Sequence, residues 1–347
     1  MKMMKAVILK DIGEYAVVDK PVPVVKKSDD MLCRIECSSI CGSDVHILAN
    51  PPAIVANKGA TIGHELVCTV EKVGDAVTSF KPGERLVFDP NITCGKCKYC
   101  QMGRPNMCEN MYTLGVQEDG AFSEYVVVPE RAAFKIAQDL PAEVAIFAEP
   151  LSCVLSAVNK ARLLPGETVV VLGGGPIGQY FIKLFKANGA GKVICSEVSS
   201  FRADFAKKSG ADRVVDPTQE DLAEIVKKET GGLGADVVVD AVGILINDAI
   251  NAARCGGRLV LFGNNQAARE TINQSQITLK ELTVIGSYIA RYTFPDTVKL
   301  LESGLLDLDY LITHRIGISD FKTGIEAMRK GQAMEVVIYP DGDPAIK

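Results

Sequence analysis

The fold is decided by the stretch Val169-Val170-Val171-Leu172-Gly173-Gly174-Gly175-Pro176-Ile177-Gly178, in which a β-branched apolar run leads directly into a glycine-rich turn. The residues from Tyr180 to Lys186 then form an apolar, amphipathic stretch of the kind that makes a helix. A strand, a glycine turn and a helix in this order predict one βα unit of a nucleotide-binding sheet.

The turn itself carries the pattern G-x-G-x-x-G at Gly173, Gly175 and Gly178. The first glycine permits the tight turn, the second lets the backbone approach a pyrophosphate, and the third allows close packing of helix on strand. The helix that starts at Pro176 and Ile177 adds unpaired N–H groups and a positive dipole for the phosphates. We therefore expect a dinucleotide here. The competing interpretation is a glycine-rich turn without a nucleotide.

An acidic residue follows where such sites need one. Glu197 ends the next predicted strand, about 20 residues after the turn, where a carboxylate hydrogen-bonds the adenosine ribose and repels a 2′-phosphate. NAD is therefore favoured over NADP, although the neighbouring Arg202, a further cofactor-binding candidate, leaves that preference open. Val242 and Gly263 directly follow later predicted strands, where the nicotinamide half would lie, and either is otherwise an ordinary turn.

Strands alternate with helical segments through this part of the chain, which predicts an α/β, doubly wound parallel sheet. The predicted strands are Thr168–Leu172, Lys192–Glu197, Asp236–Ala241, Arg258–Phe262 and Leu282–Ser287. The pattern stops after Ser287, where a helix (Phe294–Leu301) and two short elements follow. We expect a dinucleotide-binding domain over residues 151–287 and a return segment over 288–347 that completes the first domain.

Residues 1–150 have a different texture, with short strands between glycine and proline turns, which predicts a β-rich domain. The expected strands include a pair within Lys5–Val18, Met31–Cys37, Leu66–Val73, Leu86–Phe88 and Gly120–Pro129. A short helix begins near Cys41. A longer helical stretch, Ala142–Ala161, is interrupted by Pro150 and leads into the second domain.

Four cysteines gather in the loop of residues 91–111, at Cys94, Cys97, Cys100 and Cys108. Four thiolates in one short loop match a tetrahedral zinc site with no position left for water, which is a structural site. An iron–sulfur cluster is the alternative, because C-x2-C-x2-C also occurs in ferredoxins. A zinc ribbon for nucleic acid is disfavoured, because the loop lacks clustered aromatic residues.

A second metal site is indicated by the runs Cys41-Gly42-Ser43-Asp44-Val45-His46 and Gly63-His64-Glu65. Taken singly, a lone cysteine or histidine is usually a core residue. Together they offer sulfur from Cys41 and nitrogen from His64, and a catalytic zinc needs such ligands with one position left open. The third ligand is an acid, either Glu65 or Glu149 in Ala148-Glu149-Pro150, and the sequence does not rank the two.

Composition bounds the remaining possibilities. The chain has 347 residues, a length that suits two domains, with globular hydrophobic and charged fractions of 47% and 23%. The net charge of −5 without a long basic run gives no support to nucleic-acid binding. No segment is expected to span a membrane, and the N-terminus does not match a signal peptide. The eleven cysteines are expected to be thiols or metal ligands of a cytoplasmic protein.

These motifs together resemble the zinc-dependent medium-chain dehydrogenase/reductase family, and most closely its polyol (sorbitol-like) dehydrogenase branch. The resemblance covers essentially the whole chain. It implies a GroES-like, β-rich catalytic domain, a Rossmann domain, two zinc ions per chain (one catalytic, one structural), NAD, and a homodimer or homotetramer. The stretch Gly59-Ala60-Thr61-Ile62 lacks the proline common there in the family, so the substrate is not carried over by analogy.

The resemblance also implies a mechanism. The catalytic zinc binds the hydroxyl of a secondary alcohol, a hydride passes to the nicotinamide, and a proton leaves through a hydroxyl and a histidine, which match Ser43 and His46 here. The competing interpretations are a helix cap for Ser43 and a surface position for His46. Zinc-bound His64 needs an acceptor for its other ring nitrogen, for which Asp89 is one candidate.

The substrate expected from the resemblance is a sugar alcohol or related polyol. Threonine or a vicinal diol such as butanediol is the alternative within the family. Lys58 and Arg291 are candidates for holding a phosphorylated or acidic substrate. Outside this class the alternatives are a zinc-free reductase on the same fold, which would lack the metal motifs, and a cofactor-binding scaffold without turnover.

Overall fold

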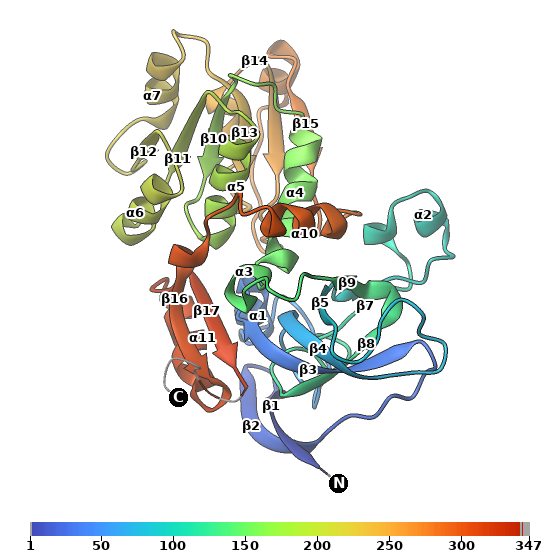
Figure 1. The fold of residues 1–347 in the computed structure, drawn as a ribbon. Coiled ribbons are helices and arrows are strands. Elements are labelled where there is room, and N and C mark those ends of the chain that lie inside the picture. The colour runs from blue at the N-terminus through green and yellow to red at the C-terminus, as the bar shows by residue number, and fades with distance from the viewer. Residues whose placement is uncertain (1, 341, 343–347) are drawn as a thin grey trace. The chain divides into compact units, whose positions relative to one another are not determined.

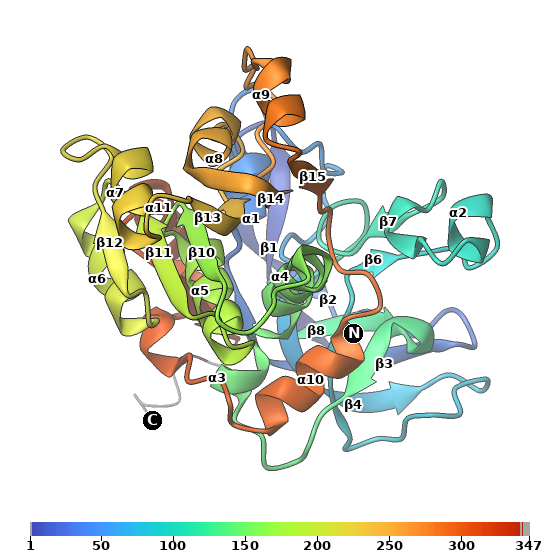
Figure 2. The ribbon, with the colours of Figure 1, turned by 90° about the horizontal axis from the view of Figure 1, so that it is seen from above.

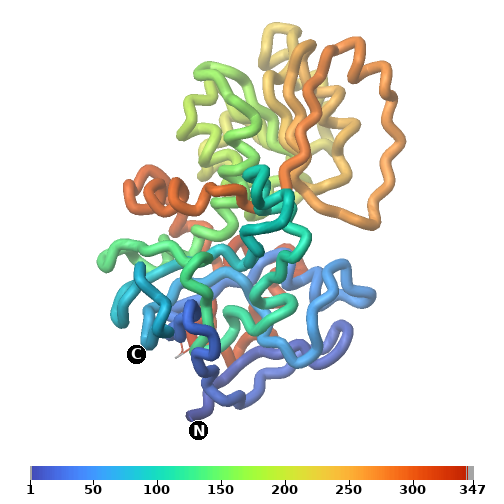
Figure 3. Tube along the Cα trace, turned by 90° about the vertical axis from the view of Figure 1, so that its right-hand side faces the viewer, coloured from blue at the N-terminus to red at the C-terminus, as the bar shows by residue number. Residues whose placement is uncertain are grey.

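The computed structural model describes residues 2–340 and residue 342. It divides the chain into two compact units, of which the first contains Met1–Pro150 and Arg291–Lys347 and the second contains Leu151–Ala290. Figure 3 shows the chain leaving the first unit and returning to it. The boundaries expected from the sequence fall after residues 150 and 287.

The second unit contains a six-stranded sheet in the order β12-β11-β10-β13-β14-β15, with every neighbouring pair parallel (Figure 2). Its strands are β10 (Thr168–Leu172), β11 (Lys192–Ser196), β12 (Arg213–Val215), β13 (Ala235–Asp240), β14 (Ala253–Leu261) and β15 (Thr283–Gly286). The order reverses beside β10, which is the arrangement of a doubly wound dinucleotide-binding sheet. The predicted α/β class is therefore confirmed.

Helices cover this sheet because its central strands are apolar on both faces. The helices after the first strand are α5 (Pro176–Ala187), α6 (Ser200–Lys208), α7 (Leu222–Glu229), α8 (Ile246–Ala252) and α9 (Gln274–Leu279). Helix α5 packs on β10 and β11, and α8 packs on β13 and β14. The side chains of Val169–Leu172 are fully buried, so the strand that carries the glycine turn lies in the core.

The first unit is built on a seven-stranded sheet (Figure 1). Its order is β16-β17-β3-β4-β5-β9, with β8 also paired to β3, where the strands are β3 (Asp30–Ser39), β4 (Glu65–Val73), β5 (Arg85–Phe88), β8 (Tyr125–Pro129), β9 (Ala133–Lys135), β16 (Ile312–Gly317) and β17 (Glu335–Tyr339). Strand β17, near the end of the chain, pairs antiparallel with β3. The return segment thus completes this sheet.

Two small two-stranded sheets and several helices complete the first unit. Strands β1 (Met3–Asp11) and β2 (Glu14–Pro21) form one of them, and β6 (Asn91–Ile92) pairs with β7 (Tyr112–Thr113) in the other. The helices are α1 (Gly42–Ile47), α2 (Lys98–Gln101), α3 (Ala142–Ala145), α10 (Phe294–Glu302) and α11 (Phe321–Arg329), and α4 (Ala148–Ala161) begins here and continues into the second unit. Phe321 of α11 packs against the rings of Tyr15 and Phe122 in the core.

Two local expectations are wrong. Pro150 does not interrupt the stretch 142–161, because it lies in the first turn of α4, where a backbone N–H has no partner within the helix anyway. The break lies at residues 146–147 instead. The expected strand Gly120–Pro129 shortens to β8, since residues 120–124 are held by irregular backbone bonds such as Gly120 N–H to the Thr61 carbonyl.

The expectation that no segment has the length and apolarity of a membrane span also needs correction. The helical stretch Ala142–Ala161 meets both criteria. Its tested window is 72% buried inside the protein, however, and a buried core helix meets the same criteria. The stretch is therefore weak evidence for a membrane.

Candidate functional site

The candidate open metal site forms where β3 ends and β4 begins. Strand β3 runs through Ser39, and Cys41 follows as the residue before α1. Ser39 pairs directly with Glu65, the first residue of β4, so the two motifs that lie far apart in sequence meet across the sheet. One ligand atom each from Cys41, His64 and Glu65 lie within 4.8 Å of one another.

This cluster is buried and rich in negative charge. His64 is 7% exposed and Glu65 is 3% exposed. Burial would lower the pKa of His64, but the carboxylates of Asp44, Glu149 and Glu65 outweigh it and raise that pKa to about 10. Burial and the nearby acids raise the pKa of Cys41 to about 12. Acids thus outnumber bases in this cluster, and a divalent cation would offset their charge and hold the thiol as thiolate.

A residue that the sequence analysis did not assign supports His64. The Oδ1 atom of Asp44, a fully buried residue, lies 3.5 Å from Nδ1 of His64, and its other oxygen accepts the N–H of Cys41 at 2.9 Å. Asp89, the expected acceptor, instead accepts from the backbone and side chain of Asn91. Asp44 therefore replaces Asp89 as the partner of His64. The signal available in the sequence was the spacing from Cys41 to Asp44, which lies within one helical turn.

The remaining candidates of this site lie on two helices. Glu149 is in the first turn of α4, and its charge raises the pKa values of Cys41, His64 and Glu65, so it lies close to them although it is outside the tightest group. Ser43 and His46 are three residues apart on α1, where that spacing places side chains on neighbouring positions of one face. Ser43 is half-buried and His46 is exposed.

The donor set fits zinc. Sulfur, imidazole nitrogen and carboxylate oxygen are the atoms that bind this ion, and three protein ligands leave a position open for substrate. Because Nδ1 of His64 faces Asp44, its other ring nitrogen is available to a metal. Neither Asp44 Oδ1 nor His64 Nδ1 makes a full hydrogen bond to a described residue, as expected for a pair that tightens when the ring binds a cation.

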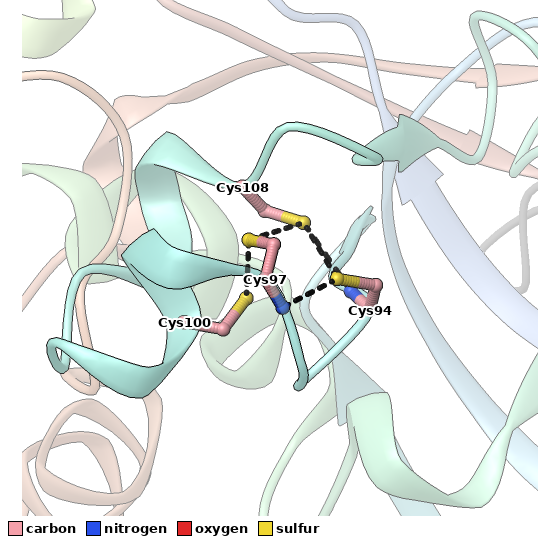
Figure 4. A group of neighbouring side chains, drawn as sticks. All are labelled: Cys94, Cys97, Cys100 and Cys108. Atoms are coloured by element: carbon pink, nitrogen blue, oxygen red, sulfur yellow. Dashed lines mark hydrogen bonds between the residues drawn. The ribbon is translucent and has the colours of Figure 1, made fainter.

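The four cysteines of the loop come together as a second cluster (Figure 4). The Sγ atom of Cys97 lies 3.6 Å from that of Cys100 and 3.9 Å from that of Cys108, and Cys108 Sγ lies 3.5 Å from Cys94 Sγ. A tetrahedral site with Zn–S bonds of ~2.3 Å requires separations of about 3.8 Å. The geometry of this loop therefore fits one closed zinc site.

Backbone donors prepare these sulfurs for a metal. Cys97 N–H donates to Cys94 Sγ, and Cys94 N–H donates to Cys108 Sγ, both at 3.3 Å. The backbone N–H groups of Lys96 and Cys97 lower the pKa of Cys94 to about 6, which favours the thiolate that binds metal. Arg291, from the return segment, donates to the Gly103 carbonyl at 2.9 Å and holds the loop in place.

In the second unit, the glycine turn has the geometry that its pattern predicts. Gly173 has φ +96°, and a Cβ on Gly178 would lie 1.9 Å from the Gly173 carbonyl oxygen, so neither position accepts a side chain. A Cβ on Gly175 would meet only Arg202, at 3.9 Å, so the space above this residue is open for a ligand. Gly175 directly precedes α5, whose first residues are Pro176 and Ile177.

Glu197 and Arg202 lie beside this turn. The carboxylate of Glu197 accepts the N–H of Gly174 at 2.7 Å and that of Ser199 at 2.8 Å, which fixes it against the turn while leaving lone pairs for a ribose. Arg202 lies close to Gly175, and its Nε is buried without a hydrogen-bond partner in the described structure. The sequence analysis missed Gln179, whose amide donates to the Gly174 carbonyl at 2.6 Å and supports the turn.

Val242 and Gly263 meet at the same edge of this sheet. A Cβ on Gly263 would lie 2.3 Å from the backbone of Val242, and a Cβ on Gly173 would lie 2.6 Å from the Val242 side chain. Asp240 organises this edge by accepting the N–H groups of Val242 and Gly243 at 2.9 and 2.7 Å. The candidate residues from β10, β13 and β14 are therefore neighbours at the carboxyl ends of their strands, where such sheets bind ligands.

Two family models match the chain. Residues 27–138 match the alcohol dehydrogenase GroES-like domain, and residues 176–303 match the zinc-binding dehydrogenase domain. The first range lies within the first unit, and the second range lies mainly within the second unit. Each unit therefore matches its own family model.

Individual relatives match almost the whole chain. The chain is 37% identical to an L-threonine 3-dehydrogenase of Caldanaerobacter subterraneus subsp. tengcongensis (97% of this chain, 99% of the relative) and 32% identical to D-arabinitol dehydrogenase 1 of Uromyces fabae (97% of each). A Sinorhizobium meliloti 1021 structure bound to NADP and described as a zinc-binding dehydrogenase superposes with a TM-score of 0.91, at 33% identity over 98% of this chain and 100% of that one.

Proposed function

Because this chain belongs to the zinc-dependent medium-chain dehydrogenase family, in its polyol dehydrogenase branch, we propose that it transfers a hydride between NAD and a secondary alcohol of a sugar alcohol or related polyol. The observation that carries the proposal is the buried cluster of Cys41, His64 and Glu65 in the GroES-like unit. It offers three zinc ligands in a chain that also has a dinucleotide turn.

The proposed catalytic zinc is held by Cys41, His64 and Glu65, with Glu149 as the alternative acid. When bound, this ion supplies a Lewis acid for the oxygen of the substrate hydroxyl. Asp44 holds the ring of His64 through Nδ1 and steadies the backbone of Cys41. A second, structural zinc is proposed for the four-cysteine loop, which gives two zinc ions per chain.

The proton of the substrate hydroxyl needs a route to water, and α1 offers one. Ser43 Oγ is half-buried next to Cys41, whereas His46 is exposed on the same helix. We propose that Ser43 Oγ accepts the proton from the substrate oxygen while its own hydroxyl proton passes on to the His46 ring, which releases a proton to solvent.

The cofactor proposed for the second unit is NAD, whose nicotinamide accepts the hydride. Gly175 leaves room for the pyrophosphate, and the fixed carboxylate of Glu197 suits ribose hydroxyls and repels a 2′-phosphate. Arg202 adds positive charge beside the turn for the phosphates. Val242 and Gly263 are proposed to contact the nicotinamide half.

An uncharged polyol is favoured over a phosphorylated or acidic one. Lys58 forms an ion pair with Asp11 at 2.7 Å, and Arg291 is bonded to the Gly103 carbonyl, so both candidate cations have other partners. Threonine or a vicinal diol is the second candidate, supported by the 37% identity to the L-threonine 3-dehydrogenase.

We further propose a cytoplasmic homodimer or homotetramer. The cysteines of the described residues form no disulfide with one another, which fits a reducing compartment. Strand β15 is the last strand of its sheet, with Val284 40% exposed, so pairing with a second copy would cover this edge. Light scattering at several protein concentrations tests the assembly, and a monomer throughout would contradict it.

The decisive experiment is a screen for NAD reduction combined with metal analysis. The panel contains polyols, polyol phosphates, sugar acids, threonine and butanediol, each tested with NAD and with NADP. We expect two zinc ions per chain and the highest kcat/KM with NAD and a neutral polyol. Threonine as the best substrate would select the second candidate. Bound zinc without turnover on any alcohol would indicate a cofactor-binding scaffold and refute the proposed activity.

A further inference from the structure

A buried serine that the sequence motifs do not include contacts the candidate zinc ligand Glu65. Ser39 is the last residue of β3, its side chain is fully buried, and it pairs directly with Glu65 of β4. Directly paired residues of antiparallel strands project from the same face of the sheet. The hydroxyl of Ser39 accordingly donates a hydrogen bond to Oε2 of Glu65.

This hydrogen bond is the carboxylate's only one in the part of the chain that the structure describes. Among residues 2–340, no other side chain or backbone N–H donates to either oxygen of Glu65. A buried carboxylate normally accepts several bonds, and each one it lacks costs free energy. One hydroxyl therefore determines how Glu65 is oriented when no metal is bound.

A second carboxylate shares this face of the sheet. Val337 of β17 pairs with Ser39 from the other side, and Glu335 lies two residues before Val337, on the same face. Glu335 is 4% exposed, and its charge, together with burial and Cys41, raises the pKa of Glu65. Because this neighbour repels Glu65, the orienting bond from Ser39 gains importance.

We propose that Ser39 is a positioning residue that orients the carboxylate of Glu65 as a ligand of the catalytic zinc. The inference rests on the proposed function, in which Glu65 is the acid ligand. The hydrogen bond to Oε2 restricts the rotation of the Glu65 carboxylate before the ion binds. Less conformational freedom is then lost when Glu65 coordinates the zinc. Hydrogen-bond partners of metal ligands commonly contribute 10–100-fold to metal affinity or activity.

The chain offers a matched control one residue away. Ser38 lies on the same strand and is equally buried, but its side chain points to the opposite face and its hydroxyl has no hydrogen-bond partner among the described residues. Ser39→Ala and Ser38→Ala therefore delete the same atom from adjacent buried positions. Only the first deletion touches Glu65.

The test measures zinc affinity rather than activity alone. Each variant is titrated with a colorimetric chelator while the zinc per chain is counted, and the four-cysteine site serves as the internal reference. We expect Ser39→Ala to hold the catalytic zinc roughly 10–100-fold more weakly than wild type, with unchanged reference zinc and activity that excess zinc restores. Ser38→Ala should match wild type.

Equal affinity in all three proteins would overturn the inference, as would an equal loss in both serine variants. A wild-type chain that binds no second zinc, or that oxidises no alcohol, would instead refute the proposed function. The two failures are therefore distinguishable.

Discussion

Asp44 Oδ1 lies 3.5 Å from His64 Nδ1, and Asp44 is fully buried. The contact joins the first turn of α1 to the residue before β4, and the other oxygen of Asp44 accepts the N–H of Cys41. The Asp44 carboxylate therefore supports two candidate zinc ligands, His64 and Cys41. Removing its charge should weaken zinc binding.

Replacing Asp44 with Asn keeps the shape of the side chain and removes its charge. We expect zinc affinity at this site and kcat/KM to fall roughly 10–100-fold, because the partner that orients His64 is weakened. Chelator titration and steady-state kinetics measure the two effects. The control Asp89→Asn should leave zinc affinity unchanged, since Asp89 bonds to Asn91. A larger effect from Asp89 would restore it as the partner of His64.

The two metal clusters should separate under cysteine substitution. Cys41→Ser is expected to lose one zinc per chain and to turn over at below roughly one hundredth of the wild-type rate, with its melting temperature retained. The loss is catalytic because Cys41 belongs to the open site. Metal analysis, kinetics and calorimetry test this, and full activity in this variant would contradict the proposed zinc chemistry.

Cys97→Ser should lose the other zinc and act on stability. A closed metal site contributes folding energy, and each ~1 kcal/mol lost corresponds to about 2–4 °C in a domain of roughly 150–250 residues, so we expect the melting temperature to fall by several degrees. Calorimetry with and without chelator measures it. The same midpoint as wild type, with one zinc missing, would show that the loop does not depend on its metal.

Alanine at two glycines of the turn should affect two different properties, the stability of the fold at Gly178 and the affinity for NAD at Gly175. Gly178→Ala places a Cβ at 1.9 Å from the Gly173 carbonyl oxygen, which should destabilise the fold by about 3 kcal/mol or more. Gly175→Ala meets no atom closer than 3.9 Å and should fold normally, but its methyl group takes the space of the pyrophosphate. Denaturation and NAD titration test this pair. Unchanged NAD affinity in Gly175→Ala would place the phosphates elsewhere.

Glu197→Ser should change the choice of cofactor. Hydrogen bonds to a charged group contribute ~1.5–3 kcal/mol, so kcat/KM with NAD should fall roughly 10–100-fold, while the ratio of NADP to NAD activity rises. Glu220→Ser is the control, because Glu220 is a surface carboxylate paired with Arg213 in the same unit. A constant cofactor ratio in Glu197→Ser would remove this residue from cofactor discrimination.

The ion pair between Glu36 and Arg85 should make the first unit acid-sensitive. Burial would raise the pKa of Glu36, but hydrogen bonds from Arg85 and Thr69 outweigh it and lower that pKa below 4.5. A carboxyl with a depressed pKa stabilises the fold above its unfolded-state value, and this contribution is lost as pH falls through the folded-state pKa. Unfolding midpoints between pH 7 and pH 3 should therefore drop steeply below about pH 4.5.

Glu36→Gln should remove much of that slope and cost about 3 kcal/mol at neutral pH, since it leaves Arg85, only 11% exposed, without its charge partner. Glu71→Gln is the matched control, because the Arg34–Glu71 pair is 44% exposed on both sides and should contribute ~0–1 kcal/mol. Identical acid profiles in both variants would show that the buried pair does not set the pH dependence.

Much of the fold and of the candidate site follows from short stretches of sequence. The glycine turn is local, because the three glycines and the start of α5 lie within a few residues of one another, and their backbone geometry matches the pattern. The four cysteines likewise lie in one loop, so their spacing alone predicts that they meet. The alternation of strands and helices predicts the doubly wound sheet, since parallel strands require crossovers.

The contacts around the candidate metal ligands depend on the tertiary structure, because they join segments that are distant in the sequence. The partner of His64 is Asp44 rather than Asp89, because the turn of α1 brings its carboxylate to the ring. Ser39 reaches Glu65 through the register of β3 and β4, and Glu335 joins them through β17, almost three hundred residues later in the chain. Sequence spacing determines local contacts such as the turn and the cysteine loop. Strand register, which depends on the packing of the whole sheet, determines which side chains surround the metal ligands.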